Sequence, residues 1–279
     1  MSVLVEMTTT EVVEDFKDPG AVQRDGIIAG GIILIVGICG LTANLTAIRI
    51  IKTVPSLRNC FGNLLLLHAT GEAGIMIIFI FWAAPISFFQ LEISQTFYGL
   101  KIGYFGLFLW FVCLYVQLFK SINRLMAIAS PISYRIIFAD KNSKYVILAV
   151  IFLCLLHSIL YFFPECDFYF DADNHIWTFA PTNCGEIMSY YIDFLFCNSF
   201  MGVILVIDGI TFIFIQRGKK LINKKNKREI QFFMQACATS FVYVLELASF
   251  HLVWRLTSDP WLLFCSTSLA WELCHVIDG

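Results

Sequence analysis

The strongest constraint on the fold is a series of seven long apolar stretches, separated by short connections that hold most of the charged residues. A helix needs about 20 mostly apolar residues to cross the hydrocarbon core of a bilayer. Because lipid offers no hydrogen bonds to the backbone, stretches of this length must span as helices. We therefore predict an all-α integral membrane protein, a bundle of seven transmembrane helices at 26–279 after a tail at 1–25. The expected spans are 26–51, 60–90, 99–123, 144–163, 187–215, 230–255 and 261–279.

Composition supports a lipid environment and argues against an enzyme. The chain is 58% hydrophobic and 14% charged, whereas soluble domains have about 25% charged residues. A core of this size cannot hide the excess, so we expect the bilayer as a partner. We find no phosphate-binding glycine loop, no CxxC pair and no HExxH motif. The sequence predicts no catalytic activity, no cofactor, no metal ligands and no nucleic-acid partner.

The basic residues predict the orientation of the bundle. The first, third and fifth connections carry three, five and seven Lys and Arg residues, while every other connection and the tail carry two or fewer. Basic connections stay in the cytosol, so we expect the amino terminus outside. This orientation argues against the seven-helix odorant channels of insects, whose amino terminus lies inside. The tail lacks the basic start and apolar stretch of a secretory signal peptide, so the first span would direct insertion.

The third stretch ends in Asn123-Arg124-Leu125, followed by Pro131 and Tyr134. An arginine there could simply anchor the helix at the interface. The spacing, however, resembles the acid-Arg-aromatic signature of G-protein-coupled receptors, with Pro and Tyr in the second cytoplasmic loop. Asn123 replaces the usual acid, so Arg124 either has a partner elsewhere or basal activity is high.

The fifth connection is the most basic part of the chain. Basic clusters next to a membrane bind anionic lipid head groups. At the ends of the fifth and sixth helices, the same cluster would also meet a G protein, and both interpretations can hold. The residues expected to couple to a G protein are Arg124, Pro131, Tyr134, Arg135, Lys219, Lys220, Lys224, Lys225, Lys227 and Arg228.

Two of the ten cysteines, Cys166 and Cys184, lie alone in the acidic fourth connection. The other eight lie within or at the edge of spans, where cysteine acts as a small apolar filler. Outside the cell the environment is oxidising. The usual receptor disulfide ties this loop to the third helix, but residues 99–104 contain no cysteine. We therefore predict a disulfide within the loop, between Cys166 and Cys184.

Several ionisable residues fall inside the expected spans. Such groups cost free energy in a bilayer and face the bundle interior, a water-filled cavity or one another. They could be protonated acids bonded to neighbouring helices, they could line a ligand cavity, or they could form a path for protons or ions. The candidates for buried polar or cavity positions are Glu72, Asp193, Glu246, His251, Glu272 and His275.

Stretches from the third helix to the end of the chain resemble the serpentine receptor class X chemoreceptors of nematodes. They are 122–128, 131–138, 166–171, Trp177, Cys184 and the ending Trp-Glu-x-x-His-x-x-Asp-Gly at 271–279. The resemblance implies the rhodopsin-like plan of seven helices. It also implies a receptor in the plasma membrane of sensory neurons that binds a small environmental chemical and activates a heterotrimeric G protein. The chain departs from other such receptors in lacking the Asn-Pro-x-x-Tyr ending and the Cys-Trp-x-Pro switch.

Two alternatives stay open. The buried acids could serve a seven-helix transporter or channel. The chain could also be a truncated, nonfunctional receptor. The last stretch of 19 residues would extend about 28 Å at about 1.5 Å per residue, which barely spans a hydrocarbon core of about 30 Å, and no basic anchor follows it.

Overall fold

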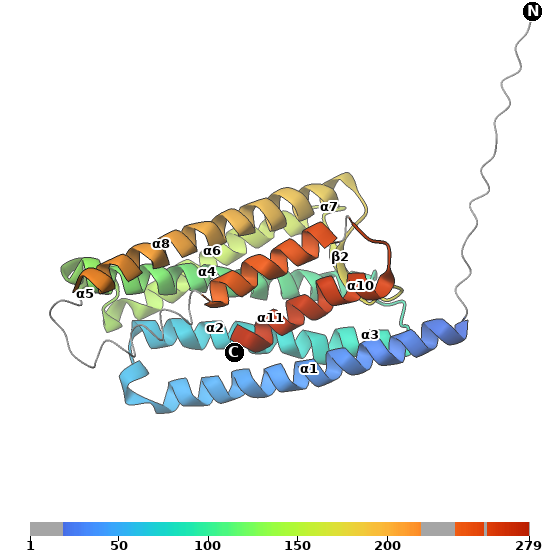
Figure 1. Cartoon of the computed structure of the whole chain (residues 1–279), viewed down its shortest axis with the longest axis horizontal. Helices are drawn as coiled ribbons and strands as arrows, with labels where there is room; N and C mark the ends of the chain where they lie inside the picture. The colour runs from blue at the N-terminus through green and yellow to red at the C-terminus, as the bar shows by residue number, and fades with distance from the viewer. Residues whose placement is uncertain (1–18, 219–237, 254–255, 279) are drawn as a thin grey trace, which may run out of the picture.

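The computed structural model describes residues 19–218, 238–253 and 256–278 of the chain. Long helices lie side by side in one bundle (Figure 1), and they overlap the seven expected apolar stretches. In chain order they are α1 (Pro19–Thr53), α2 with η2 and α3 (Cys60–Ile78, Phe79–Ala83, Ala84–Phe89), α4 (Phe97–Ala129), α6 with η4 (Ser143–Ser158, Ile159–Phe162), α7 with η5 and α8 (Asn183–Ile187, Met188–Phe196, Cys197–Gly218), Ala238–Val253, and α10 with η8 and α11 (Pro260–Phe264, Cys265–Leu269, Ala270–Asp278).

Five of these helices are long and apolar enough to cross a membrane within the described residues. Their outer faces carry large apolar side chains such as Phe81, Phe152 and Val206, which are 71%, 65% and 62% exposed. Water disfavours so much exposed apolar surface, whereas lipid accepts it. The basic residues at 219–228, which are expected to meet a G protein, lie outside the described residues.

Several helix starts are defined by capping side chains. Asn59 accepts a hydrogen bond from the backbone N–H of Gly62, and Asp259 accepts one from Leu262. Such caps satisfy N–H groups that have no partner within the helix. Pro131 begins the short helix α5 (Pro131–Ile137), where its fixed φ suits the first turn. Two 3-10 turns lie in connections between helices: η1 (Pro55–Leu57) lies between α1 and α2, and η3 (Asp140–Asn142) lies between α5 and α6.

Four helices are widened locally into π-helical turns. These are η2, η5 and η8, already given, and η7 (Ser249–Val253), at the end of the helix Ala238–Val253. A π turn inserts an extra residue and rotates the following side chains relative to a regular helix, and such turns often lie at functional sites. Helices five, six and seven thus each carry one π turn beside the same end of the bundle.

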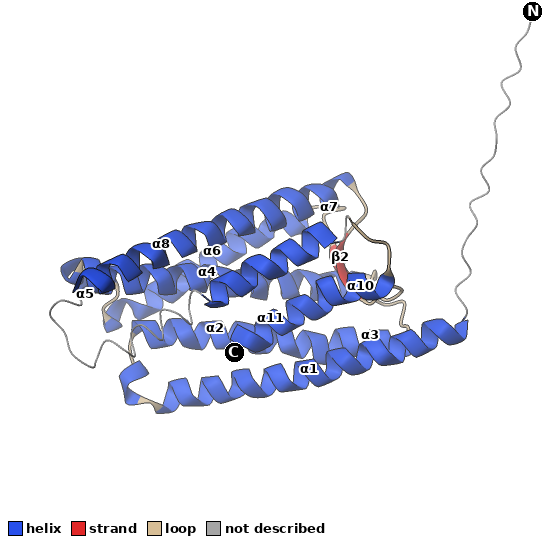
Figure 2. Ribbon diagram, viewed as in Figure 1, coloured by secondary structure: helices blue, strands red, loops and turns tan. Residues whose placement is uncertain are grey.

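A β-hairpin covers that end, which we call the hairpin end (Figure 2). Strand β1 (Phe168–Asp171) pairs antiparallel with β2 (Ile176–Phe179), with Phe168 opposite Phe179. These strands were not expected from the sequence, which predicts an all-α protein. Gly103 of α4 permits the close approach, since a Cβ there would lie 1.9 Å from the Phe168 carbonyl oxygen. The opposite end carries α5, and we call it the α5 end.

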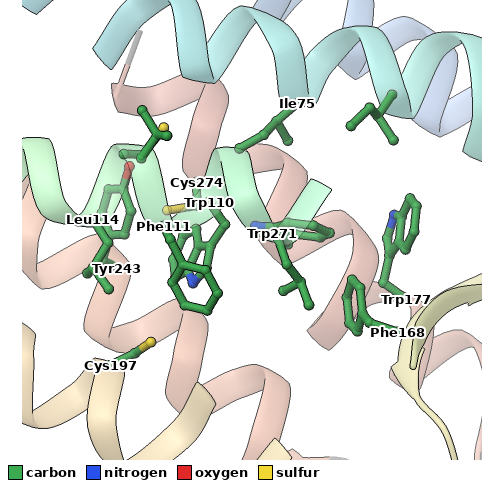
Figure 3. Close-up of a cluster of buried hydrophobic side chains, with 14 of the residues drawn as sticks. Ile75, Trp110, Phe111, Leu114, Phe168, Trp177, Cys197, Tyr243, Trp271 and Cys274 are labelled. Atoms are coloured by element: carbon green, nitrogen blue, oxygen red, sulfur yellow. The ribbon is translucent and has the colours of Figure 1, made fainter. Parts of the chain in front are cut away.

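Aromatic side chains connect the hairpin to the bundle core (Figure 3). Trp177 of β2 is 1% exposed, and its ring centroid lies 5.8 Å from that of Trp271 on α11 and 6.1 Å from that of Phe79 on η2. Its backbone N–H also donates to Ser268 Oγ at 3.0 Å. Deeper in the bundle, Trp110 of α4 stacks on Tyr243 with centroids 5.2 Å apart. The hairpin is therefore packed into the bundle as part of its core.

Candidate functional site

A cavity of about 780 Å³ lies at the hairpin end. It lies between the hairpin and the fifth, sixth and seventh helices of the bundle, which are α7 with η5 and α8, Ala238–Val253, and α10 with η8 and α11. Its size suits a small molecule, since ligand pockets have about 300–1,000 Å³. Aromatic side chains form a large part of its walls, and its polar groups lie on the hairpin, α7, η5, η7 and η8. The aromatic lining residues are Tyr169, Trp177, Phe179, Tyr190, Tyr191 and Phe250, and the main polar ones are Asp171, Glu186, Ser189, His251 and Thr267.

A chain of polar side chains begins at the cavity wall and passes between helices five and six. Ser189 Oγ lies 3.4 Å from His251 Nδ1, and His251 Nε2 lies 2.9 Å from Asp193 Oδ2. Ser189 and Asp193 lie on η5, and His251 lies on η7. The two π turns thus bring together Asp193 and His251, both expected as buried polar candidates. Of these two, His251 lines the cavity and Asp193 lies behind it.

The charges around the cavity are acidic. Asp171 and Glu186 contribute carboxylates, and the lining within the described residues contains no Lys or Arg. Burial, together with the nearby Asp171 carboxylate, raises the pKa of the Tyr169 hydroxyl. That hydroxyl therefore stays protonated and can donate a hydrogen bond at neutral pH. Such a surface favours a neutral or positively charged molecule over an anion.

A second polar group is buried in the middle of the bundle. Glu72 of α2 is fully buried and bonds through Oε2 to His275 Nδ1 on α11. The Tyr243 hydroxyl lies 2.8 Å from Glu72 Oε1 and 3.0 Å from Asp278 Oδ2, in position to donate to either. His68 Nε2 lies 3.2 Å from the same Asp278 oxygen. The structure therefore joins the candidates Glu72 and His275, but in the bundle centre, away from the cavity lining.

The remaining two candidates, Glu246 and Glu272, lie outside the cavity lining, although Glu246 is in electrostatic contact with Asp193. Glu246 is buried and is absent from the cavity lining. Glu272 faces α1, where a Cβ at Gly37 would lie 3.0 Å from Glu272 Oε1. Neither Glu272 oxygen has a hydrogen-bond partner among the described residues. Both acids are buried, as expected, and neither lines the cavity.

At the α5 end, Arg124 forms an ion pair with Asp208 of α8. Arg124 Nη2 lies 2.7 Å from Asp208 Oδ1, and Ser121 Oγ donates to the same oxygen at 2.5 Å. Asp208 is fully buried, and Arg124 is largely buried beside it. Of the two possibilities left by Asn123, the structure thus shows a partner from elsewhere. Asp208 was visible as an acid in an apolar stretch, but its pairing with Arg124 was not predicted.

The other expected coupling residues divide into two sets. Pro131, Tyr134 and Arg135 lie on α5, next to the end of α4. Arg135 is exposed, while the Tyr134 ring stacks on Phe138 with centroids 5.9 Å apart. The six basic residues from Lys219 to Arg228 lie outside the described residues, so their coupling role stays a prediction.

Cys166 and Cys184 form a disulfide, the pair predicted from the sequence. It closes the connection around the hairpin, and Thr182 Oγ1 donates to the Glu165 carbonyl oxygen beside it. Free cysteines in the described residues lie elsewhere in the bundle.

Loss of this disulfide is expected to destabilise the hairpin end. Replacing Cys184 by Ser should reduce the amount of protein at the cell surface, because a loop of this length contributes about 3 kcal/mol on the chain-entropy model. The exposed free cysteine Cys265 gives the matched control, Cys265→Ser. Surface labelling measures the amount, and non-reducing mass mapping of the wild type tests the bond itself. Finding both thiols free would contradict the pairing.

Comparisons with known proteins agree with this architecture. Residues 34–279 match the family described as "Serpentine type 7TM GPCR chemoreceptor Srx". The chain is 26% identical over 282 residues to "Serpentine receptor class X 45" of Caenorhabditis elegans, covering 92% of this chain and 78% of that protein. The crystal structure of squid rhodopsin is similar with a TM-score of 0.65 at 15% identity, covering 92% of this chain and 75% of that one. These findings confirm the all-α seven-transmembrane fold and the resemblance drawn from the sequence.

Proposed function

The chain belongs to the Srx family of serpentine seven-transmembrane chemoreceptors, and from this premise we propose that it binds a small environmental chemical and activates a heterotrimeric G protein. The ligand would enter the cavity at the hairpin end, and the G protein would contact the α5 end. The protein would have no catalytic activity and no cofactor. Residues 1–25 would form a tail, and 26–279 would form the receptor domain.

The proposed orientation places the amino terminus and the hairpin outside the cell. The basic first, third and fifth connections support it, since basic connections remain in the cytosol. Arg124, α5 and the basic residues at 219–228 would then face the cytosol. The membrane would be the plasma membrane of a sensory neuron, in line with the family.

The cavity chemistry supports a particular kind of ligand. Aromatic walls favour a molecule with a flat or apolar body, and aromatic faces also attract cations. Ser189 and His251 offer hydrogen bonds on one wall, and Asp171 and Glu186 disfavour an anion. A small neutral or positively charged molecule with at least one hydrogen-bonding group fits these conditions best.

One observation supports transmission from the cavity to the G protein. Asp193 and Asp208 lie on the continuous helix formed by α7, η5 and α8, about 22 Å apart at about 1.5 Å per residue. Asp193 bonds His251 beside the cavity, and Asp208 holds Arg124 at the other end. A ligand that displaces the His251–Asp193 pair would move this helix and release Arg124. It would shift the equilibrium only by its difference in affinity for the two states.

The test separates a receptor from the transporter or channel that the buried acids would otherwise allow. Cells expressing the chain are exposed to a panel of small amines and neutral aromatic compounds, while second messenger and membrane current are recorded together. A receptor gives a second-messenger response that G-protein blockade abolishes. A ligand-evoked current that survives the blockade would favour the channel. Absence of an amino-terminal tag from the surface of unpermeabilised cells would contradict the orientation.

Changes at the polar wall are expected to weaken the response to an active compound. His251→Ala removes the hydrogen-bonding group that faces the cavity, and Asp193→Asn weakens its support. Hydrogen bonds to charged groups contribute about 1.5–3 kcal/mol, so the concentration for half-maximal response should rise about tenfold or more. Tyr145→Ala is the control, because Tyr145 is exposed on α6 near the α5 end and is absent from the cavity lining. Equal potency of the wild type and the His251 variant at equal surface expression would contradict the assigned ligand site.

A further inference from the structure

We infer that His68, Glu72, Cys113 and Asp278 form a binding site for a divalent transition-metal cation such as Zn²⁺ in the centre of the bundle. His68, Glu72 and Cys113 each offer one ligand atom, and these three atoms lie within 4.8 Å of one another. All three residues are buried. No metal ligands were expected from the sequence, because only His68 and Glu72 are close in the chain, four residues apart on α2, whereas Cys113 and Asp278 come from α4 and α11.

The distances suit a tetrahedral ion. Zn²⁺ binds His nitrogen and carboxylate oxygen at about 2.0–2.2 Å, which places neighbouring ligand atoms about 3.4 Å apart in a tetrahedron. His68 Nε2 lies 3.6 Å from Glu72 Oε1 and 3.2 Å from Asp278 Oδ2. Cys113 Sγ completes the set, and its longer bond of about 2.3 Å relaxes the distance required. The three atoms lie within 4.8 Å of one another, so binding would draw the thiol closer to the other ligands.

The hydrogen bonding around His68 also points to a ligand. His68 is 5% exposed, and its Nε2 makes no hydrogen bond of acceptable geometry among the described residues, although it lies close to two carboxylates. Buried polar atoms of side chains nearly always have a partner. An imidazole nitrogen directed at two carboxylate oxygens and a thiol forms the mixed nitrogen, oxygen and sulfur set that Zn²⁺ and its neighbours prefer.

Charge at this position favours a cation. Glu72 and Asp278 bring two carboxylates into the bundle centre, and a cysteine that binds a metal does so as the thiolate. The nearby cation is Lys120 of α4, buried and in electrostatic contact with Asp278, Glu72 and Cys113. One ammonium balances only one of the two carboxylates present before an ion binds, and binding would add the Cys113 thiolate as a third negative group. A divalent ion would balance the other two.

The surrounding residues already hold the ligands in place. His275 Nδ1 binds the Glu72 oxygen that faces away from His68, and the Tyr243 hydroxyl lies between Glu72 and Asp278. Trp110 packs against both Tyr243 and His275. Outer partners of this kind orient metal ligands, and their loss lowers metal affinity about 10- to 100-fold. A bound ion would tie helices two, three and seven together and stabilise the arrangement in which the four ligands meet.

The test uses the purified full-length protein in detergent, freed of metal with a chelator and then titrated with Co²⁺. Cobalt bound to a thiolate gives a charge-transfer band in the near ultraviolet. We expect the band in the wild type and in Cys154→Ala, a buried cysteine on α6 outside the cluster. We expect its loss in Cys113→Ala. His68→Gln keeps the thiol and should weaken Co²⁺ binding at least about tenfold, and His275→Ala should weaken it about 10- to 100-fold.

Zn²⁺ gives a second readout. It should raise the melting temperature of the wild type and of Cys154→Ala, and leave that of Cys113→Ala unchanged. A melting transition in the absence of metal shows whether each variant folds. If Cys113→Ala does not fold, His68→Gln takes its place in the Zn²⁺ melting experiment. The site is overturned if the wild type gives no thiolate band, or if the band persists in Cys113→Ala or is unaffected in His68→Gln.

Discussion

Replacing Asp208 by Asn is expected to raise ligand-independent G-protein signalling at least about fivefold, because coupling free energies between sites are typically about 1–3 kcal/mol. The carboxylate holds Arg124 at 2.7 Å and is fully buried. Asn keeps the shape and a hydrogen bond but removes the charge that holds the arginine. Arg124 then becomes free to leave α8 and contact the G protein. Second messenger per receptor at the cell surface is the quantity to measure.

Two variants give the controls for this experiment. Asp140→Asn removes an exposed acid of η3, near the same end of the bundle, and basal signalling should stay at the wild-type level. Ser121→Ala removes one hydrogen bond to Asp208 and should have an intermediate effect. Breaking a buried ion pair also destabilises a protein, by about 3–5 kcal/mol, so normalisation to surface expression is essential. Basal signalling of Asp208→Asn at or below the wild-type level would show that the pair does not restrain the receptor.

Replacing Trp177 by Ala is expected to have the largest effect on folding. The side chain is 1% exposed and contacts Phe168, Phe170, Phe79 and Trp271. Removal of a buried Phe or Trp side chain costs about 3–5 kcal/mol. The hairpin should separate from helices two and seven, and the cavity should lose a wall. We expect a lower melting temperature of the purified protein and little or no response to an active compound.

The matched control for Trp177 is Phe81, an aromatic residue of η2 that is 71% exposed on the outside of the bundle. Phe81→Ala should leave the melting temperature close to that of the wild type, because lipid or detergent replaces the lost contacts. A Trp177→Ala protein that melts at the wild-type temperature would mean that the hairpin is not packed as described.

The seven helices could be predicted from the sequence because the bilayer imposes one requirement on each of them separately. A run of about 20 apolar residues must be helical in lipid, whatever its neighbours are. The same reasoning does not extend to the hairpin, whose strands have four residues each. Strands this short show no clear alternation of apolar and polar residues. The hairpin is stabilised by contacts between residues far apart in the sequence, such as that of Trp177 with Trp271.

The candidate site was predicted only in part, for a related reason. An acid in an apolar stretch signals burial, but it does not reveal its partner. Arg124 and Asp208 are 84 residues apart, and Glu72 and His275 are 203 apart. The π turns that bring Asp193 to His251 have no signal in the sequence that we could use. The pairings accessible from spacing were those of His68 with Glu72 and of Trp271 with His275, each four residues apart on one helix face.

Coupling through Arg124 can be measured most directly without a known ligand. Asp208→Asn receptor is purified, reconstituted in lipid vesicles and mixed with purified heterotrimeric G protein, and guanine nucleotide exchange on the G protein is followed. We predict faster exchange than with the wild type, and a return to the rate of empty vesicles in the double variant Asp208→Asn/Arg124→Gln. Exchange no faster than with empty vesicles for Asp208→Asn, or full exchange in the double variant, would contradict coupling to a G protein through Arg124.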